Sequence, residues 1–242
     1  INLSVPSKKA VSTTWGPLEP GTVRLALPDG HQQKHTIGFL ERAGIRMNGY
    51  QQGNPVCRPD IGIDGVVVKV VRPQDMPLQV ANDNFDLAIT GQDWLRDHLV
   101  QFPSSPVHQL LDMSYGKIRL LAVVHNDVPV NSLEELKEMM VSGKLTRIRV
   151  ASEYINIADK YARDNHLAPY SIVPTWGASE SFLPEDADLL IENAETGATL
   201  LKNNLKIIDQ LMETTPCVIG NKNNVAKRDK IAQVMEILKK GL

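Results

Sequence analysis

Short apolar runs alternate with helix-like segments along most of this chain, and this alternation restricts its fold more than any other feature. The runs at 23–27, 66–71 and 85–90 read VRLAL, VVVKVV and FDLAIT, and each leads into a turn and a helical pattern. A β-branched, almost wholly apolar run such as VVVKVV is typical of a strand buried on both faces. Strands that alternate with helices indicate βαβ units. The pattern therefore predicts an α/β fold with mixed, mostly parallel sheets.

The second half of the chain continues this alternation, and no internal repeat is evident in the sequence. Further strands are expected at 118–125, 147–151, 170–174, 188–192, 205–213 and 217–220. Helices are expected at 31–43, 73–80, 153–165, 196–203 and 225–240, and another helix is expected to begin at residue 92. A further helix is expected after Ser132, which is a suitable cap residue and is followed by Glu134 and Glu135 in the first turn. The segment 49–64 is rich in Gly and Pro and is expected to be a loop with a short ribbon.

Roughly nine or ten strands are more than one small sheet carries comfortably. We therefore expect two lobes with a central cleft. We assign residues 1–22 to an N-terminal extension, residues 23–115 and 205–242 to the first lobe, and residues 116–204 to the second lobe.

Charge and composition exclude several classes of protein. Lys and Arg number 26 against 28 Asp and Glu, a formal charge of −2, which argues against a polybasic nucleic-acid binder. No apolar run is long enough to span a membrane, and the first residues lack the apolar core of a secretory signal. We expect a cytoplasmic protein, or one in an organelle after loss of a presequence. Cys57 and Cys217 are expected to be free thiols, with one long-range disulfide as the alternative.

The most informative motif is DLLIENAETGATL at 188–200, where an apolar strand ends in carboxylates and turns into a helix. Backbone N–H groups converge at such a turn and can hold a phosphate. The residues of this turn are Thr196, Gly197, Ala198 and Thr199. Glu192 and Glu195 beside it suit ribose hydroxyls or a bound Mg²⁺. The motif predicts a phosphoribosyl site, and a simply capped helix start is the alternative.

Two weaker motifs also follow strands. Thr90 and Gly91 end the run FDLAIT, where ligands of α/β sheets bind, although an ordinary strand–helix junction explains them equally well. Arg72 could hold a phosphate or form a surface salt bridge with Asp75. His31 and His35 have the spacing of metal ligands on a helix, but exposed helix residues are the better interpretation. Dinucleotide-binding, P-loop and hydrolase-elbow motifs are missing.

Taken together, these segments resemble the ATP phosphoribosyltransferases, which catalyse the first step of histidine biosynthesis. The resemblance extends from Val23 to Gly220 in the family's order. Its segments are LALPDG (25–30), VVRPQDMP (70–77), FDLAITGQD (85–93), LLDMSYGKIRL (110–120), RVASEY (149–154), WGASE (176–180) and DLLIENAETGATL (188–200). The last is the most specific, because it looks like the family's loop for 5-phosphoribosyl-1-diphosphate (PRPP).

The resemblance implies a fold, a reaction and partners. The fold is two-lobed and similar to type II periplasmic-binding proteins, and the chain looks like the family's short form. The implied reaction transfers phosphoribose from PRPP to N1 of ATP, giving phosphoribosyl-ATP and pyrophosphate, with Mg²⁺ bound mainly through substrate phosphates. No protein ligand of a metal is predicted. A homodimer, or a hetero-oligomer with a regulatory subunit similar to histidyl-tRNA synthetase, is implied, without nucleic-acid or membrane partners.

The resemblance also implies roles for particular residues. Glu192 and Glu195 are the expected catalytic residues, and the turn at 195–199 is expected to anchor the 5-phosphate. Arg72 is a further expected phosphate ligand. The cleft is expected to be lined by Asp86, Thr90, Gly91, Ser179 and Glu180.

One departure from the family's pattern lies after the first strand. Asp29 and His31 stand where the family has Lys and Arg, which removes up to two positive charges from a site for two polyphosphates. A catalytically impaired paralogue that binds a phosphoribosyl or nucleotide ligand in a regulatory role is therefore the alternative function.

Overall fold

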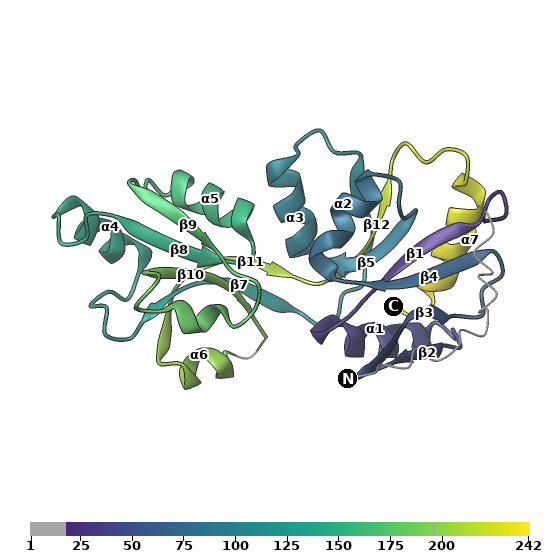
Figure 1. Cartoon of the computed structure of the whole chain (residues 1–242), viewed down its shortest axis with the longest axis horizontal. Helices are drawn as coiled ribbons and strands as arrows, with labels where there is room; N and C mark the ends of the chain where they lie inside the picture. The colour runs from purple at the N-terminus through teal and green to yellow at the C-terminus, as the bar shows by residue number, and fades with distance from the viewer. Residues whose placement is uncertain (1–17, 196) are drawn as a thin grey trace, which may run out of the picture.

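Two five-stranded sheets organise the molecule into two lobes (Figure 1). The computed structural model describes residues 18–195 and 197–242. In the first sheet the strand order is β4 (Val66–Val71), β1 (Val23–Pro28), β5 (Leu87–Gly91), β12 (Pro216–Asn221) and β6 (Val107–Asp112). Around it lie α1 (His31–Arg42), η1 (Pro73–Asp75), α2 (Met76–Ala81), α3 (Gln92–Gln101) and α7 (Arg228–Lys239).

The second sheet has the order β11 (Leu205–Thr214), β7 (Ile118–His125), β10 (Leu189–Ala194), β8 (Ile148–Ser152) and β9 (Tyr170–Pro174). Its helices are α4 (Leu133–Val141), α5 (Ile155–Asp164), η2 (Ser179–Phe182) and α6 (Ala198–Lys202). The predicted cap of α4 is confirmed, because the Ser132 hydroxyl oxygen accepts a hydrogen bond from the Glu135 amide at 3.2 Å.

The chain passes between the lobes twice, once between β6 and β7 and once between β11 and β12. We assigned all residues from 205 onward to the first lobe, but the strand pairing places residues 205–214 in the second lobe. β11 pairs antiparallel with β7 along its whole length, from Leu205 opposite His125 to Thr214 opposite Ile118. Strand β11 therefore belongs to the second sheet, and the chain returns to the first sheet only at Thr215.

The sheets are mixed, as expected, but parallel pairing does not dominate. The pairs β1–β4, β1–β5, β10–β8 and β8–β9 are parallel, while the other four pairs of the two large sheets are antiparallel. The prediction that VVVKVV is buried on both faces is wrong, since β4 is an edge strand in which only Val68 is fully buried. The expected ribbon is present as β2 (Asn48–Gln51) with β3 (Asn54–Asp60). The sequence did not indicate β6 or η2.

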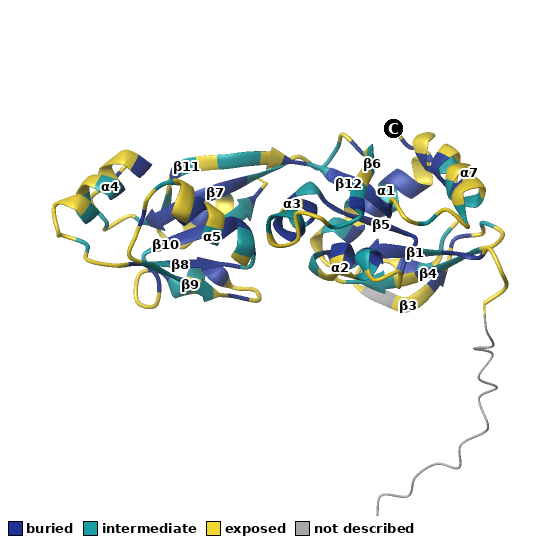
Figure 2. Cartoon of the chain, turned by 90° about the horizontal axis from the view of Figure 1, so that it is seen from above, coloured by how far each residue is buried: buried dark blue, intermediate teal, exposed yellow. Residues whose placement is uncertain are grey.

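Each lobe has its own hydrophobic core, in which strand residues are buried and helices expose their outer faces (Figure 2). Trp94 of α3 nevertheless packs against the core of the second lobe, so the lobes touch through side chains as well as through the two crossings. Cys57 and Cys217 are free, as expected. Among the described residues, no helix is long and apolar enough to cross a membrane.

Candidate active site

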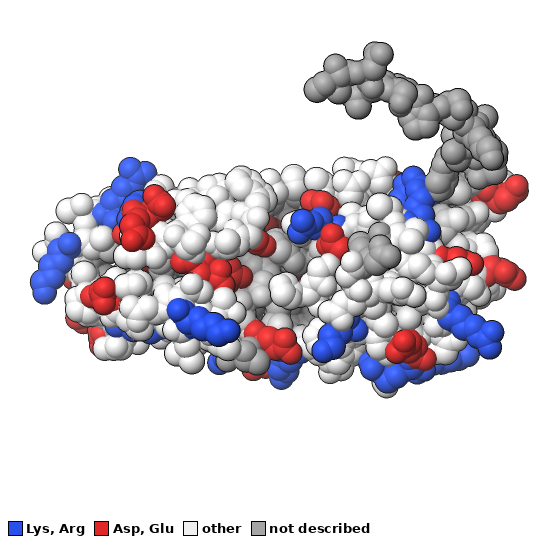
Figure 3. Space-filling view, turned by 60° about the horizontal axis from the view of Figure 1, so that its bottom comes forward, with Lys and Arg blue, Asp and Glu red and all other residues white. Residues whose placement is uncertain are grey.

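The carboxyl ends of the parallel strands in the two lobes point toward each other. In open α/β sheets, ligands bind beyond these ends. Strand β5 leads directly into α3 in the first lobe, and β8 leads through Tyr154 into α5 in the second. The Tyr154 hydroxyl donates a hydrogen bond across the lobes to Asp93 Oδ2 at 2.7 Å. The space-filling view shows a hollow between the lobes, with acidic side chains gathered on one side of it (Figure 3).

Asp93, Tyr154 and Asn193 form a polar bridge across this cleft. Besides its bond to Asp93, the Tyr154 hydroxyl oxygen accepts a hydrogen bond from Asn193 Nδ2 at 2.8 Å. The Trp94 and Tyr154 rings stack with centroids 4.1 Å apart. Asp93 and Tyr154 are both buried. The bridge therefore connects the start of α3 in one lobe to the end of β10 in the other.

A second contact between the lobes lies one helical turn further along α3. The Asp97 carboxylate accepts hydrogen bonds from the amides of Asn156 and Ile157 at 3.0 and 2.9 Å, and from the Asn156 side chain at 2.7 Å. These amides belong to the first turn of α5, which has no intrahelical partners for them. Asp97 thus caps a helix of the opposite lobe.

Burial dominates the electrostatics of both aspartates. Burial raises the pKa of Asp93 above its usual range, and the hydrogen bond from Tyr154 offsets this only in part. Burial likewise raises the pKa of Asp97, against the hydrogen bonds from Ile157 and Asn156. The folded protein therefore holds a proton on these groups more tightly than the unfolded chain does.

Glu192 lies near the carboxyl end of β10, next to Asn193 of the bridge. Burial raises its pKa to about 7, although hydrogen bonds from the Asn193 amide and Ser179 favour the charged form. The negative charges of Glu180 and Glu153 raise this pKa further. Ser179 is buried and accepts a hydrogen bond from Thr175 Oγ1 at 3.1 Å. Glu192 is thus a half-buried carboxyl that changes charge near neutral pH.

The turn after β10 leads into the short helix α6. Gly197 has a φ of 74°, a left-handed conformation that glycine adopts at little cost. Glu195, Ala198 and Thr199 are exposed, and Thr196 lies outside the described residues. The described residues contain no group of three or more His, Cys, Asp and Glu side chains that could hold a metal ion.

The sequence profile described as ATP phosphoribosyltransferase matches residues 72–240 of the chain. This chain belongs to the ATP phosphoribosyltransferase family. The ATP phosphoribosyltransferase of Chlorobaculum parvum is 30% identical over 224 residues, which are 89% of this chain and 70% of that protein. That of Desulfatibacillum aliphaticivorans is 29% identical over 230 residues, 91% of this chain and 73% of that protein.

Solved structures agree on the fold of this family member. The ATP phosphoribosyl transferase (HisG:HisZ) complex from Thermotoga maritima has a chain that aligns with a TM-score of 0.70 at 20% identity, covering 90% of this chain and 98% of that one. The AvGluR1 ligand-binding domain aligns with a TM-score of 0.54 at 13% identity, covering 93% of this chain and 92% of that one. The fold is the two-lobed one of type II periplasmic-binding proteins, as predicted.

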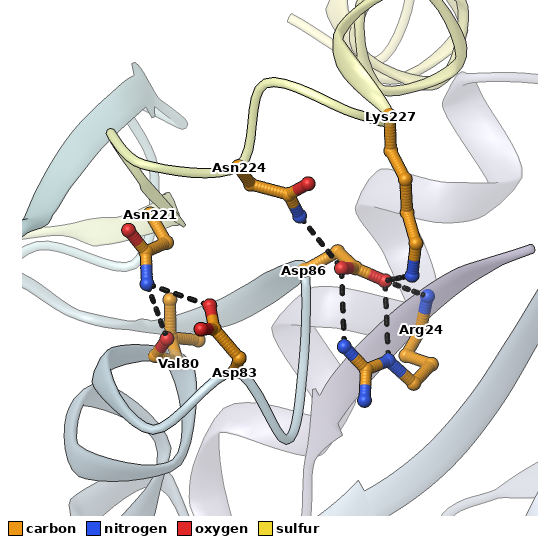
Figure 4. A network of polar contacts seen from close by, with 7 residues as sticks. All are labelled: Arg24, Val80, Asp83, Asp86, Asn221, Asn224 and Lys227. Carbon is orange, nitrogen blue, oxygen red and sulfur yellow. Dashed lines mark hydrogen bonds and ion pairs between the residues drawn. The ribbon is translucent and has the colours of Figure 1, made fainter. Parts of the chain in front are cut away.

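In this ATP phosphoribosyltransferase family member, the structure brings together only part of the predicted site. Glu192, Ser179 and Glu180 lie close to one another in the second lobe. The prediction that Asp86 lines the cleft is wrong. Asp86 precedes β5 and therefore lies at the amino end of this strand, whereas the cleft lies at the carboxyl ends. Figure 4 shows its carboxylate between Arg24, Lys227 and Asn224. Burial would raise the pKa of Asp86, but hydrogen bonds from Arg24 and Lys227 outweigh burial and lower it.

Thr90 and Gly91 lie at the edge of the cleft, but their roles there are structural. Thr90 is completely buried and donates its hydroxyl to the Pro73 carbonyl at 2.9 Å, so its side chain does not line the cleft. A Cβ atom at Gly91 would overlap the Asp93 carboxylate, so glycine at this position makes room for the bridge.

Arg72 remains at the cleft edge of the first lobe, since it follows β4. It is largely exposed, and its Nε lies 3.4 Å from Asp29 Oδ2. The predicted partner Asp75 is replaced by Asp29, because parallel β1 and β4 end side by side. The aspartate that departs from the family's pattern thus also offsets the positive charge of the neighbouring Arg72.

The contacts between the lobes involve four residues that were not predicted from the sequence: Asp93, Asp97, Tyr154 and Asn193. Asp93 and Tyr154 occur in the family-like segments FDLAITGQD and RVASEY, each two residues after the end of a strand. The position after a strand was therefore an available signal. Their contact across the lobes depends on how the two sheets face each other, which strand periodicity does not specify.

Proposed function

We propose that this protein transfers the phosphoribosyl group of PRPP to N1 of the adenine of ATP, releasing pyrophosphate, as the first step of histidine biosynthesis. The match of the ATP phosphoribosyltransferase profile over residues 72–240 carries this conclusion. The family match does not favour the alternative of an impaired regulatory paralogue.

In this reaction the protein mainly has to position the two substrates and stabilise the charge that develops in the transition state. C1 of the ribose gains oxocarbenium character as pyrophosphate leaves, so no covalent catalysis is needed. In our assignment, the turn at 195–199 binds the 5-phosphate through backbone N–H groups and hydroxyls. Glu192 and Glu195 accept hydrogen bonds from the ribose hydroxyls, and Ser179 with Glu180 sets the position and charge of Glu192.

The remaining ligands approach from the first lobe. We assign phosphate binding there to Arg72 and to backbone N–H groups near Gly91. Mg²⁺ would be bound through the substrate phosphates and would neutralise the departing pyrophosphate. We further propose a cytoplasmic location and a hetero-oligomer with a regulatory subunit similar to histidyl-tRNA synthetase, which the HisG:HisZ complex of Thermotoga maritima supports.

A direct test mixes the protein with PRPP, ATP and Mg²⁺, with and without the regulatory subunit, and measures pyrophosphate release. We expect pyrophosphate and phosphoribosyl-ATP in equal amounts. Glu192→Gln should release less pyrophosphate, and Glu185→Gln is its matched control, because Glu185 is an exposed carboxylate of the same lobe. Binding of PRPP without turnover under both conditions would instead support the regulatory paralogue.

A further inference from the structure

Trp176 is an exposed aromatic side chain next to the candidate active site. Its exposed fraction is 85%, whereas Trp94 is stacked on Tyr154. Among the described residues, no aromatic ring or cation is stacked against Trp176. The exposed indole is a large, flat apolar surface that a planar ligand can cover.

The loop that carries Trp176 is anchored on both sides. On one side, Thr175 is buried and its amide donates a hydrogen bond to the Ser152 carbonyl at 3.1 Å. On the other side, buried Ser179 accepts the hydrogen bond of the Thr175 hydroxyl. Between them, Gly177 and Ala178 have φ values of 103° and 50°. The left-handed conformation of Ala178 is unfavourable for a residue with a side chain. The anchored ends of the loop hold Ala178 in this conformation.

The same loop reaches Glu192. Trp176 follows the carboxyl end of β9, which is two positions from β10 in the sheet. Neighbouring strands are about 4.8 Å apart, so the ends of β9 and β10 are about 10 Å apart. Ser179, three residues after Trp176, hydrogen-bonds to Glu192. Helix α6, which follows β10 in the chain, packs against β11, at the edge of the sheet opposite to β9.

We propose that the adenine ring of ATP stacks on Trp176. This inference rests on the proposed function, which places the ribose of PRPP at Glu192 and its 5-phosphate at the 195–199 turn. N1 of adenine must then approach C1 of that ribose, on the β9 side of Glu192. The carboxylates of Glu153, Glu180 and Glu192 repel phosphates in this region. A neutral base stacked on indole avoids that repulsion.

The test is calorimetric titration of the full-length chain with ATP, PRPP and inorganic tripolyphosphate. Stacking of one base on an aromatic side chain corresponds to about a tenfold or greater change in affinity on substitution by alanine. We expect Trp176→Ala to weaken ATP binding by about tenfold, while Trp176→Phe stays within about threefold of the parent. Binding of PRPP and tripolyphosphate should not change in either variant. Val141→Ala, at an exposed apolar residue of the same lobe, is the control and should bind ATP normally.

The outcomes separate this inference from the proposed function. Unchanged ATP affinity in Trp176→Ala, or equal losses for ATP and PRPP, would overturn the stacking role. A change of oligomeric state in Trp176→Ala with unchanged ATP affinity would assign the ring to a protein interface and would also overturn it. If the parent protein bound neither ATP nor PRPP, the proposed function itself would fail.

Discussion

The two lobes contain the same Arg–Asp clamp at corresponding places. In the first lobe the Arg24 amide donates to Asp86 Oδ2 at 2.7 Å, and in the second the Arg149 amide donates to Asp188 Oδ2 at 2.8 Å. Each guanidinium also binds both oxygens of its carboxylate. In return, each aspartate amide donates to the carbonyl of its arginine at 2.9 Å. Each clamp fastens the amino ends of two neighbouring parallel strands.

The correspondence extends to the whole sheet. The order β4-β1-β5-β12-β6 of the first lobe has the same strand directions as β9-β8-β10-β7-β11 of the second. The chain order β1, β4, β5, β6 also corresponds to β8, β9, β10, β11, but β12 is the last strand of its sheet in the chain, whereas β7 is the first of its own. No internal repeat is evident in the sequence, because few identities remain beyond the shared pattern of FDLAI and ADLLI. The repeat is visible in topology and in the clamps.

The differences between the lobes indicate what each part does. The Asp86 side chain is 1% exposed and has Lys227 and Asn224 as further donors. Asp188 is 23% exposed, and among the described residues its carboxylate is bonded to Arg149 alone. At the carboxyl ends, the position of buried Thr90 corresponds to that of Glu192. The residues at the amino ends of the strands are therefore similar in the two lobes and have a structural role. The residues at the carboxyl ends differ between the lobes, and they include the candidate catalytic residue Glu192.

The largest expected effect concerns the unequal clamps. Asp86→Ala leaves Arg24 and Lys227 without their common carboxylate, and we expect it to lower the free energy of unfolding by about 3 kcal/mol. Asp188→Ala, at the more exposed clamp, should cost about 1 kcal/mol. Urea unfolding at pH 7 measures both. Equal losses would contradict the difference in burial.

The second prediction concerns the divergent carboxyl ends. Because the pKa of Glu192 is about 7, activity should rise with pH through neutrality as the carboxylate forms. Glu192→Gln should lower kcat/KM for PRPP by about 10- to 100-fold and abolish this rise. Thr90→Val at the corresponding position should keep the shape of the pH profile. A profile of Glu192→Gln parallel to that of the parent would exclude Glu192 as the titrating group.

The third prediction concerns Asp97, which makes one of the contacts between the lobes. Asp97→Ala removes the cap of α5 and should lower the free energy of unfolding by about 1 to 2 kcal/mol. Asp97→Asn keeps a cap oxygen and should remain close to the parent at pH 7. Since the folded-state pKa of Asp97 is raised, its protonation adds stability as the pH falls toward about 3.9, the unfolded value.

Asp86 should respond to acid in the opposite direction. Its folded-state pKa is lowered, so its contribution is complete above about 3.9 and is lost as the pH falls through the folded value. Unfolding curves of Asp86→Asn and Asp97→Asn between pH 3 and pH 7, roughly this titration range, compare the two. If both variants diverged from the parent in the same direction with pH, one assignment would be wrong.

The smallest expected effect is at the exposed pair of the first lobe. Asp29→Asn frees Arg72 from its neighbouring carboxylate and should increase PRPP affinity by about twofold. In an Arg72→Gln background the same substitution should have no effect. Calorimetry of the four proteins forms a complete double-mutant cycle. An equal gain in both backgrounds would show that Asp29 acts independently of Arg72.

Much of this fold follows from local sequence signals. Apolar runs and cap residues predicted most strands and helices, and the two-lobed architecture followed from the number of strands. The strand β11 was assigned to the wrong lobe because pairing partners depend on distant segments. Asp86 was misplaced because the resemblance carried the whole segment FDLAITGQD into the site, although Asp86 precedes the strand and only the residues after the strand reach the cleft. The bridge of Asp93 and Tyr154 depends on both lobes at once.

The two chain crossings have a consequence for biosynthesis on the ribosome. The sheet of the second lobe is built from one continuous stretch, 118–214, so its strands can pair as soon as that stretch has emerged. The first sheet is different, because β12 lies between β5 and β6 and is made more than a hundred residues after them. Until β12 arrives, the inner edge of β5 is open. The first sheet of the nascent chain therefore stays incomplete until β12 is made, when all strands of the second sheet have already been synthesised.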